Sequence, residues 1–306
     1  MNLSLQICGI PLAHPIINGS GTFDAIAARR AFGAAVEERF PFSAFVSKTI
    51  TPEPRAGNGP PRLYETPAGL INSIGLPNKG LVGFIAEDLP ELARLRVPLV
   101  VSVMAPSHSG FATLVERVGE HEGVAAIELN ISCPNVESGL IVGEQPAEAL
   151  ALLEALRPLT DRRLIVKLTP NCADPAAVAA AAAEGGADAI SMINTLRATA
   201  LRPDTLEPWL GAGSGGLSGP AVRAVALDQL RRVAAVVSIP VIGMGGIETG
   251  ADALAFLAAG ASAVAVGTAS FRDPAAAVRI RSELEGELSG RGLDGLRAGH
   301  AASTSS

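Results

Sequence analysis

The chain is poor in cysteine, and its cysteines have no spacing that would bind a metal or build a disulfide framework. Cys8, Cys133 and Cys172 are the three cysteines in 306 residues, and no two of them form a CxxC pair. An odd number without such a pair argues against both a zinc site and a set of disulfides. We therefore expect a cytoplasmic protein, kept in a reducing compartment.

Histidine and aromatic residues are also scarce. The single tyrosine and the single tryptophan, Tyr64 and Trp209, are expected on loops as packing or interface anchors rather than as stacking platforms for a cofactor. The four histidines are scattered without the spacing of metal ligands, so we expect them at the surface or in loops and expect no bound metal. They are His14, His108, His121 and His300.

An excess of positive charge and long apolar runs are missing as well. The 24 basic residues are outnumbered by 30 acidic ones, and the net charge of -6 leaves no basic surface for nucleic acid. Apolar runs are too short to span a bilayer, and the N-terminus at 1–4 lacks the basic region and apolar stretch of a signal peptide. We expect a soluble protein that binds neither nucleic acid nor membrane.

The chain does contain enough apolar sequence, 48% of its residues, for one large core. Short β-branched runs alternate with Ala- and Leu-rich segments, which is the pattern of parallel strands joined by helices. Eight such units predict an α/β fold, a (β/α)8 TIM barrel, as a single domain over 1–289. A β-hairpin is expected before it at 3–12, and the small polar tail at 290–306 is expected to be disordered. The predicted strands are 16–18, 44–48, 99–103, 126–130, 164–168, 189–193, 241–243 and 263–266, and the predicted helices are 81–94, 110–121, 146–156, 175–184, 221–236 and 250–259.

A thiol framed by amides follows the fourth predicted strand. The apolar run 124–129 leads directly into Asn-Ile-Ser-Cys-Pro-Asn at 130–135. Pro134 cannot continue a central strand, so the chain must turn just after Cys133 and present this side chain above the sheet. Most lone cysteines are small buried hydrophobes, but the flanking Asn130 and Asn135 favour a functional thiol at the rim where barrel enzymes keep their active sites.

Other polar residues fall at the same predicted rim. Lys48 and Thr49 end the second strand, and Asn194 and Thr195 follow the sixth. Glycine-rich turns at 243–247 and 265–269 follow the seventh and eighth strands, where barrels often bind a phosphate. A tight turn alone could explain either set of glycines, but two in consecutive units favour a phosphate site.

Lys167 lies inside the apolar fifth strand, where an ammonium group needs an anionic partner or a use. The alternative is a side chain that extends to the rim and leaves its charge in water. Reduced flavin carries negative charge at its N1/O2 edge, and flavin mononucleotide (FMN) also has a phosphate. One ligand would therefore account for both Lys167 and the glycine turns.

Several motifs together resemble those of class 1 dihydroorotate dehydrogenases. The resemblance runs from about Leu3 to Glu285. The forms Lys-Leu-Thr-Pro-Asn and Met-Ile-Asn-Thr are most similar to class 1B, the catalytic subunit of the NAD-dependent enzyme, whereas Glu-Thr-Gly at 248–250 is more similar to the fumarate-using class 1A. The motifs are Asn-Ser-Ile-Gly-Leu-Pro-Asn at 72–78, Asn-Ile-Ser-Cys-Pro-Asn at 130–135, Lys-Leu-Thr-Pro-Asn at 167–171, Met-Ile-Asn-Thr at 192–195, Gly-Gly-Leu-Ser-Gly-Pro at 215–220 and Ile-Gly-Met-Gly-Gly at 242–246.

The resemblance implies an oxidoreductase of pyrimidine biosynthesis that oxidises dihydroorotate to orotate on one FMN per chain. Cys133 would be the general base, since an unperturbed thiol pKa of about 8.5 needs only modest tuning to give thiolate. The implied substrate-binding residues are Lys48, Asn72, Ser73, Ile74, Gly75, Leu76, Asn130, Asn135, Asn194 and Thr195. The implied FMN-binding residues are Ser20, Lys48, Thr49, Asn130, Lys167, Ile193, Gly219, Gly245, Gly246, Gly267 and Thr268.

The chain departs from this family at one position in its third strand. Class 1B members commonly have Asn there, whereas this chain has Ser102. A serine would have to reach the flavin with its shorter side chain or through a water molecule. The segment 136–145 after Cys133 is expected to form a lid.

The resemblance also implies partners. The resemblance to class 1B implies a homodimer of this chain. A second subunit that carries FAD and a [2Fe-2S] cluster would join it and give a heterotetramer. This chain has neither a four-cysteine cluster motif nor a dinucleotide fingerprint, so NAD reduction would need that second polypeptide. A class 1A-like homodimer that reduces fumarate, a non-redox phosphate-binding barrel isomerase or lyase, and a noncatalytic scaffold are the alternatives.

Overall fold

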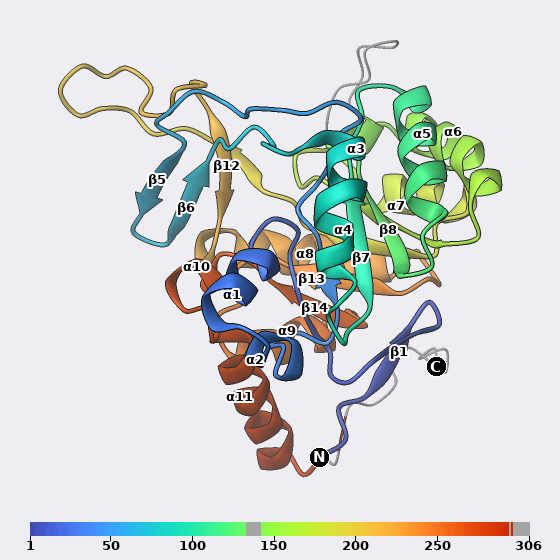
Figure 1. Cartoon of the computed structure of the whole chain (residues 1–306). Helices are drawn as coiled ribbons and strands as arrows, with labels where there is room; N and C mark the ends of the chain where they lie inside the picture. Colours follow the sequence, from blue (N-terminus) through green and yellow to red (C-terminus); the bar gives the residue numbers. More distant parts are fainter. Residues whose placement is uncertain (133–141, 294, 296–306) are drawn as a thin grey trace.

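A nearly closed cylinder of eight parallel strands forms the centre of the molecule (Figure 1). The computed structural model describes residues 1–132, 142–293 and 295. Consecutive barrel strands are neighbours in the sheet, as expected when each is followed by a helix that returns the chain to the same end. The barrel strands are β3 (Ile16–Asn18), β4 (Phe45–Val46), β7 (Leu99–Val103), β8 (Val124–Asn130), β9 (Arg163–Lys167), β10 (Ala189–Met192), β13 (Val241–Met244) and β14 (Ala263–Val266).

The seam between β3 and β4 is closed by a side chain as well as by the backbone. Asn18 Nδ2 donates to the Val46 carbonyl at 2.8 Å, and Asn18 Oδ1 accepts from the Val46 N–H at 2.8 Å. The Ser43 N–H donates to the Ile16 carbonyl at 3.0 Å. Because Asn18 is fully buried, it satisfies backbone groups that the two short strands would otherwise leave unpaired.

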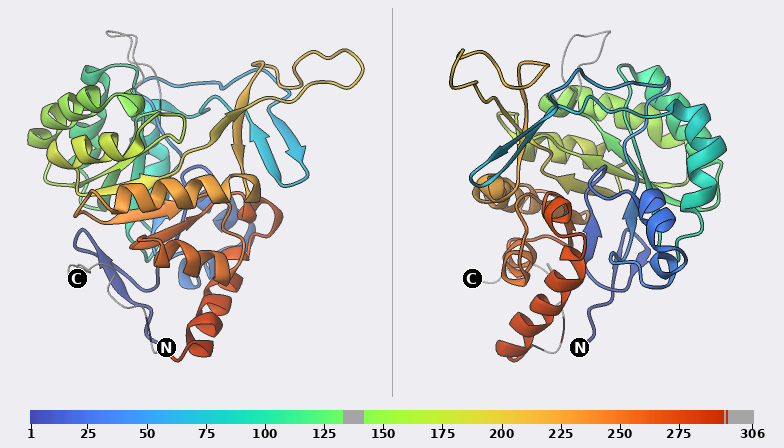
Figure 2. Two further views of the ribbon diagram at one scale, coloured as in Figure 1. Left: turned by 180° about the vertical axis from the view of Figure 1, so that it is seen from behind. Right: turned by 60° about the vertical axis from the view of Figure 1, so that its left-hand side comes forward.

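Helices surround the cylinder and bury its outer face (Figure 2). Leu152, Leu153 and Leu156 on one helix are fully buried against the sheet, while the opposite face of that helix is exposed. The helices of the barrel are α3 (Gly80–Gly83), the π-helix Phe84–Asp88, α4 (Leu89–Leu92), α5 (His108–Gly119), α6 (Pro146–Leu156), α7 (Pro175–Glu184), α8 (Arg223–Ala234), α9 (Gly250–Ala258) and α11 (Ala276–Gly290). The remaining helices are α1 (Ala25–Phe32), α2 (Ala35–Glu38), α10 (Ala269–Arg272) and the 3-10 turns Val142–Glu144, Arg157–Leu159 and Pro220–Val222.

The interior of the barrel is apolar at one end. Ile17, Val100, Ala126, Ile165 and Ile242 belong to one buried cluster, which also contains residues of the N-terminal hairpin β1 (Leu5–Ile7) and β2 (Ile10–Leu12). The hairpin lies at the end of the cylinder away from the second sheet (Figure 1). It therefore covers the amino-terminal opening, and the site must lie at the other end.

A second, antiparallel sheet lies over the carboxyl end of the barrel. It has the order β11-β12-β6-β5, so two segments far apart in sequence meet where β6 pairs with β12. The loop between β11 and β12 extends away from the barrel (Figure 2). The strands are β5 (Leu63–Thr66), β6 (Gly69–Asn72), β11 (Leu196–Ala198) and β12 (Gly215–Ser218).

The barrel with its N-terminal hairpin confirms the predicted fold class, and three of the eight strands match their predicted bounds. The sequence prediction omitted the antiparallel sheet and α11. Tyr64, predicted on a loop, lies in β5, and its ring packs edge-on against that of Trp209 at 5.4 Å between centroids. His14 lies in the loop between β2 and β3, as predicted, but it is buried at 5% exposure and its Nδ1 accepts from the Ile16 N–H at 3.3 Å.

Two further sequence predictions concern the ends and the surface of the chain. Most of the tail 290–306 lies outside the described residues, so its disorder stays a prediction, as does the single domain over 1–289. Among the described residues, no helix is both long and apolar enough to cross a membrane.

Candidate active site

A cavity of about 610 Å³ opens at the carboxyl ends of the barrel strands, beneath the antiparallel sheet. This volume is within the range of small-molecule sites. The cavity gathers residues from the ends of β3, β4, β8, β9, β10, β13 and β14, as a barrel active site would. Two of the three lysines of the chain, Lys48 and Lys167, line it.

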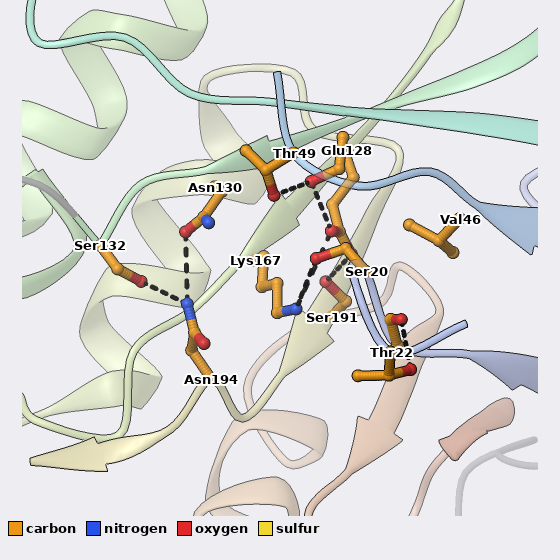
Figure 3. Close-up of polar contacts among 12 residues, drawn as sticks. Ser20, Thr22, Val46, Thr49, Glu128, Asn130, Ser132, Lys167, Ser191 and Asn194 are labelled. Atoms are coloured by element: carbon orange, nitrogen blue, oxygen red, sulfur yellow. Dashed lines mark hydrogen bonds and ion pairs between the residues drawn. The ribbon is translucent and has the colours of Figure 1, made fainter. Parts of the chain in front are cut away.

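Three polar side chains meet at the ends of β8 and β10 (Figure 3). Asn194 Nδ2 donates to Ser132 Oγ at 3.0 Å and to Asn130 Oδ1 at 3.3 Å, and Asn194 Oδ1 accepts from the Thr195 N–H at 2.9 Å. The Asn130 amide nitrogen has no acceptor among the described residues and lines the cavity. It is therefore available to donate to a ligand carbonyl or carboxylate.

Asn171 supports this arrangement from behind. Its Nδ2 donates to the Thr195 carbonyl at 3.0 Å, and its Oδ1 accepts from the Arg197 N–H at 2.8 Å. These bonds fix the course of the chain just after Asn194. On the opposite wall, Asn72 Nδ2 donates to the Gly216 carbonyl at 3.2 Å, which links β6 to β12 within the antiparallel sheet.

Lys167 and Glu128 form a buried ion pair at the floor of the cavity (Figure 3). The Lys167 Nζ lies 4.0 Å from Glu128 Oε1 and donates to Ser20 Oγ at 3.2 Å. Both charged residues are buried, at 5% and 3% exposure. A buried charge without a partner is costly, so Glu128 provides compensation that the sequence alone did not reveal.

Lys48 stands at the rim, where part of its side chain is exposed to solvent. Partial burial lowers the pKa of Lys48, and the nearby Asp24 carboxylate acts in the opposite direction. Lys48 has no hydrogen bond or ion pair within the described part of the chain. Its ammonium group is therefore free to pair with the carboxylate of a ligand.

Glycine backbone forms the wall of the cavity below β13 and β14. Gly219 and Gly246 have φ values of +91° and +74°, and a Cβ on Gly246 would lie 2.6 Å from the Gly219 carbonyl oxygen. The N–H groups of Gly246, Gly267 and Thr268 donate to no acceptor in 1–132 and 142–293. Such unpaired amides in a glycine cradle fit a phosphate group. The residues present therefore fit FMN at both its ring and its phosphate.

Ser102 is not in the cavity. Its side chain is fully buried, and its hydroxyl donates to Glu128 Oε1 at 3.0 Å and lies 2.9 Å from Thr49 Oγ1. Its hydroxyl is already used inside the barrel, and a contact between Ser102 and flavin, direct or through water, stays a prediction. Ser102 links the cavity wall at Thr49 to Glu128.

Most residues predicted for the site line the cavity together. Ser73 and Gly75 do not: the Ser73 hydroxyl accepts from Asn58 Nδ2 at 2.8 Å, and Gly75 packs against Asn58. Cys133 and Asn135 lie outside the described residues, as does most of the predicted lid 136–145. The predicted residues that line the cavity are Ser20, Lys48, Thr49, Asn72, Ile74, Leu76, Asn130, Lys167, Ile193, Asn194, Thr195, Gly219, Gly245, Gly246, Gly267 and Thr268.

Sequence reasoning missed several lining residues. Thr22 follows the glycine turn after β3, and the Gly-Ser-Gly pattern at 19–21 was a usable signal for it. Ser132 lies within the motif of Cys133 but was not assigned a role. Leu70, Leu217 and Phe271 come from the antiparallel sheet and α10, and no local pattern placed them near the site. No group of three or more His, Cys, Asp or Glu in the described residues could hold a metal.

Comparisons with known proteins agree with this site. A crystal structure of DHODH from Eimeria tenella, in complex with ferulenol, superimposes with a TM-score of 0.76 at 26% identity and covers 95% of this chain and 85% of that one. The dihydroorotate dehydrogenase B (NAD(+)) catalytic subunit of Desulforudis audaxviator is 44% identical over 95% of this chain and 94% of its own.

Two further findings concern class and family. A Solibacter usitatus protein, provisionally named dihydroorotate dehydrogenase A (fumarate), is 43% identical and covers 95% of each chain. The family model described as dihydroorotate dehydrogenase matches residues 2–288. With this match over nearly the whole barrel, and with the resemblance predicted from the motifs confirmed, the chain belongs to the dihydroorotate dehydrogenase family.

Proposed function

We propose that this protein oxidises (S)-dihydroorotate to orotate on FMN in pyrimidine biosynthesis. The observation that carries the proposal is a single cavity that joins amide side chains, two lysines and a glycine cradle at the carboxyl end of the barrel. Amide groups suit a cyclic ureide, which presents hydrogen-bond donors and acceptors side by side. The ammonium group of Lys48 suits the carboxylate of dihydroorotate.

The residues divide into three roles. Asn72, Asn130, Asn194 and Thr195 orient the pyrimidine ring, and Lys48 binds its carboxylate. Cys133 acts as general base and removes the proton at C5. Because Ser132 is held by Asn194, the backbone that leads to Cys133 is fixed up to its preceding residue.

FMN is the proposed cofactor, which when bound would supply the acceptor for the hydride that leaves C6 of the substrate. Lys167 and Ser20 would hold the ring edge, with Thr49 and Ile193 on the wall beside it. Gly219, Gly245, Gly246, Gly267 and Thr268 would hold the phosphate. The unpaired N–H groups of that cradle and the buried ammonium of Lys167 support this orientation.

The final electron acceptor is proposed to be NAD, reached through a second subunit that carries FAD and a [2Fe-2S] cluster. The similarity to NAD-linked catalytic subunits supports this proposal. The related A-type protein favours one alternative, a homodimer that reduces fumarate directly. Copurification from the native source, followed by assays with NAD and with fumarate, separates these two acceptors.

The test of the central reaction is spectroscopic. Purified protein reconstituted with FMN should be yellow, and dihydroorotate added without oxygen should bleach it. Protein that takes up no FMN, but binds a sugar phosphate, would instead support a non-redox barrel isomerase or lyase. The homodimer or heterotetramer is tested by analytical ultracentrifugation, and the cytoplasmic location, still a prediction, by cell fractionation.

A further inference from the structure

A polar layer inside the barrel separates the apolar plug from the cavity. Glu128, Lys167 and Ser191 each lie two positions beyond an inward-facing residue of the apolar cluster, namely Ala126, Ile165 and Ala189. Because side chains alternate along a strand, all three point into the cylinder. Glu128 and Ser191 are 3% and 1% exposed and are absent from the cavity lining. The proposed reaction gives neither of them a task.

Glu128 is held at both carboxylate oxygens. Ser102 Oγ donates to Oε1 at 3.0 Å, and Ser191 Oγ donates to Oε2 at 2.9 Å. A serine hydroxyl has one proton to donate. Since the Ser102 proton goes to Glu128, the Thr49 hydroxyl must be the donor in its 2.9 Å contact with Ser102. The carboxylate thus sets the direction of a hydrogen-bond chain that ends at the cavity wall.

Lys167 lies between this carboxylate and the cavity. Its ammonium group has three N–H donors. Ser20 accepts one, and Glu128 Oε1 at 4.0 Å attracts the charge without accepting a hydrogen bond of normal length. The remaining donors have no partner in the described part of the chain, and Lys167 lines the cavity.

We propose that Glu128 is a positioning residue, which holds the Lys167 ammonium at the cavity floor and offsets part of its charge toward the bound ligand. The inference rests on the proposed function, because the ligand whose charge it tunes is FMN. Two serines and one lysine fix the carboxylate, so it acts through Lys167 and through Thr49 without touching the ligand itself. It sets how strongly this edge of the site favours the more negative, reduced form of the cofactor.

The chain offers a matched control at the other end of the barrel. Asp188, just before β10, also binds through both oxygens: Oδ2 accepts from Arg157 Nη1 at 2.8 Å, and Oδ1 accepts from Arg163 Nη1 at 2.8 Å. Replacing it removes a carboxylate of similar bonding that lies away from the cavity. Asp188→Asn therefore reports the effect of lost stability alone.

The experiment compares the midpoint potential of bound FMN in wild type, Glu128→Gln and Asp188→Asn. Glutamine keeps the shape and an acceptor oxygen but removes the negative charge. We expect the Glu128→Gln potential to become more positive, with the ratio of oxidised to reduced FMN dissociation constants raised by about fivefold, as for a charge interaction weakened by solvent. Asp188→Asn should leave the potential unchanged.

The outcomes separate the two proposals. Wild type that dihydroorotate bleaches, with the same potential in Glu128→Gln as in wild type, overturns the role of Glu128 and leaves the proposed function intact. Wild type that binds no FMN overturns both. If Glu128→Gln fails to fold, the pair Glu128→Gln/Lys167→Met decides, because recovered folding supports the coupling and an equally unstable pair contradicts it.

Discussion

Asn194 Nδ2 lies 3.0 Å from Ser132 Oγ and so joins the end of β10 to the residue before Cys133. The same amide also reaches Asn130 Oδ1 at 3.3 Å. One side chain therefore links the residue before the proposed base to the proposed substrate-binding amides. Loss of the Asn194 side chain should weaken binding of the substrate more than binding of the cofactor, since the glycine cradle lies on other strands.

Asn194→Ala should raise the KM for dihydroorotate by about 10- to 100-fold, the range for hydrogen bonds to a charged or strongly polar ligand. The FMN content should stay at the wild-type level. Steady-state kinetics together with the flavin absorbance check both statements. An unchanged KM would remove Asn194 from the proposed binding site.

Cys133→Ala should lower kcat by about 10²- to 10⁴-fold, the usual contribution of a general base. FMN binding should persist. Cys172→Ala is the matched control: the Cys172 thiol lies 3.7 Å from the Thr169 carbonyl outside the cavity lining, and burial raises its pKa. Anaerobic single-turnover bleaching measures both variants. Turnover that survives Cys133→Ala would contradict the assignment of the base.

Lys48 should make substrate binding sensitive to alkaline pH. Burial lowers the pKa of Lys48, so its positive charge is lost at a lower pH than that of an ordinary lysine. The KM for dihydroorotate should therefore rise between neutral pH and about pH 10, and Lys48→Met should give a high, flat KM.

Asp24→Asn tests the cause of this pH dependence. Asp24 raises the pKa of Lys48, so its removal should move the rise in KM to lower pH. Asparagine can still cap α1 in place of the Asp24 carboxylate, which accepts from the Ala27 N–H at 2.9 Å. A pH profile identical to that of wild type would contradict the electrostatic link.

Gly246→Ala should weaken FMN binding at least about tenfold, the equivalent of roughly 1.4 kcal/mol. Its φ of +74° disfavours a side chain, and the added Cβ would meet the Gly219 carbonyl at 2.6 Å. Gly286→Ala in α11 is the control, because a Cβ there meets nothing within 4 Å. It should stabilise the fold by up to about 1 kcal/mol in urea unfolding and leave FMN affinity unchanged.

His14 should make the fold less stable in mild acid. Burial, with help from Arg281, lowers the pKa of His14 from 6.5 to about 4. Above pH 6.5 this side chain is neutral in both the folded and the unfolded state, so the free energy of unfolding loses nothing to it there. Stability should fall by on the order of 2 kcal/mol toward pH 4, because the unfolded state takes up a proton that the folded state resists.

Urea unfolding from about pH 7 to about pH 4.5 measures this loss. His14→Asn should lose less stability over the same range, since its amide can accept from the Ile16 N–H but does not titrate. Equal pH slopes for the two proteins would assign the acid sensitivity to other groups.

The barrel could be predicted from local pattern because its strands are buried on both faces. Leu99–Val103 and Ala263–Val266 are buried and mostly apolar runs, and both match their predicted bounds. The second sheet could not be predicted in this way. Leu63–Thr66 alternates between exposed and partly buried residues, and β6 is fixed by pairing with β12.

The same contrast holds for the site. Lys167 lies in an apolar strand, Lys48 and Asn194 lie at the ends of two others, and the common direction of these strands predicted that the three residues meet. The task of Glu128 depends on hydroxyls from β7 and β10, which only the register of neighbouring strands brings to it. The position of Cys133 over the ligand stays a prediction.

The pairing of β6 with β12 has a consequence for biosynthesis. Ile71 opposes Leu217 across this pair, so the ceiling of the binding chamber needs polypeptide from both halves of the chain. During translation, the ribosome must release residues beyond 218 before that ceiling can assemble. A nascent chain that ends before β12 therefore has no complete chamber, and we expect the proposed cofactor to bind only after this pairing has formed.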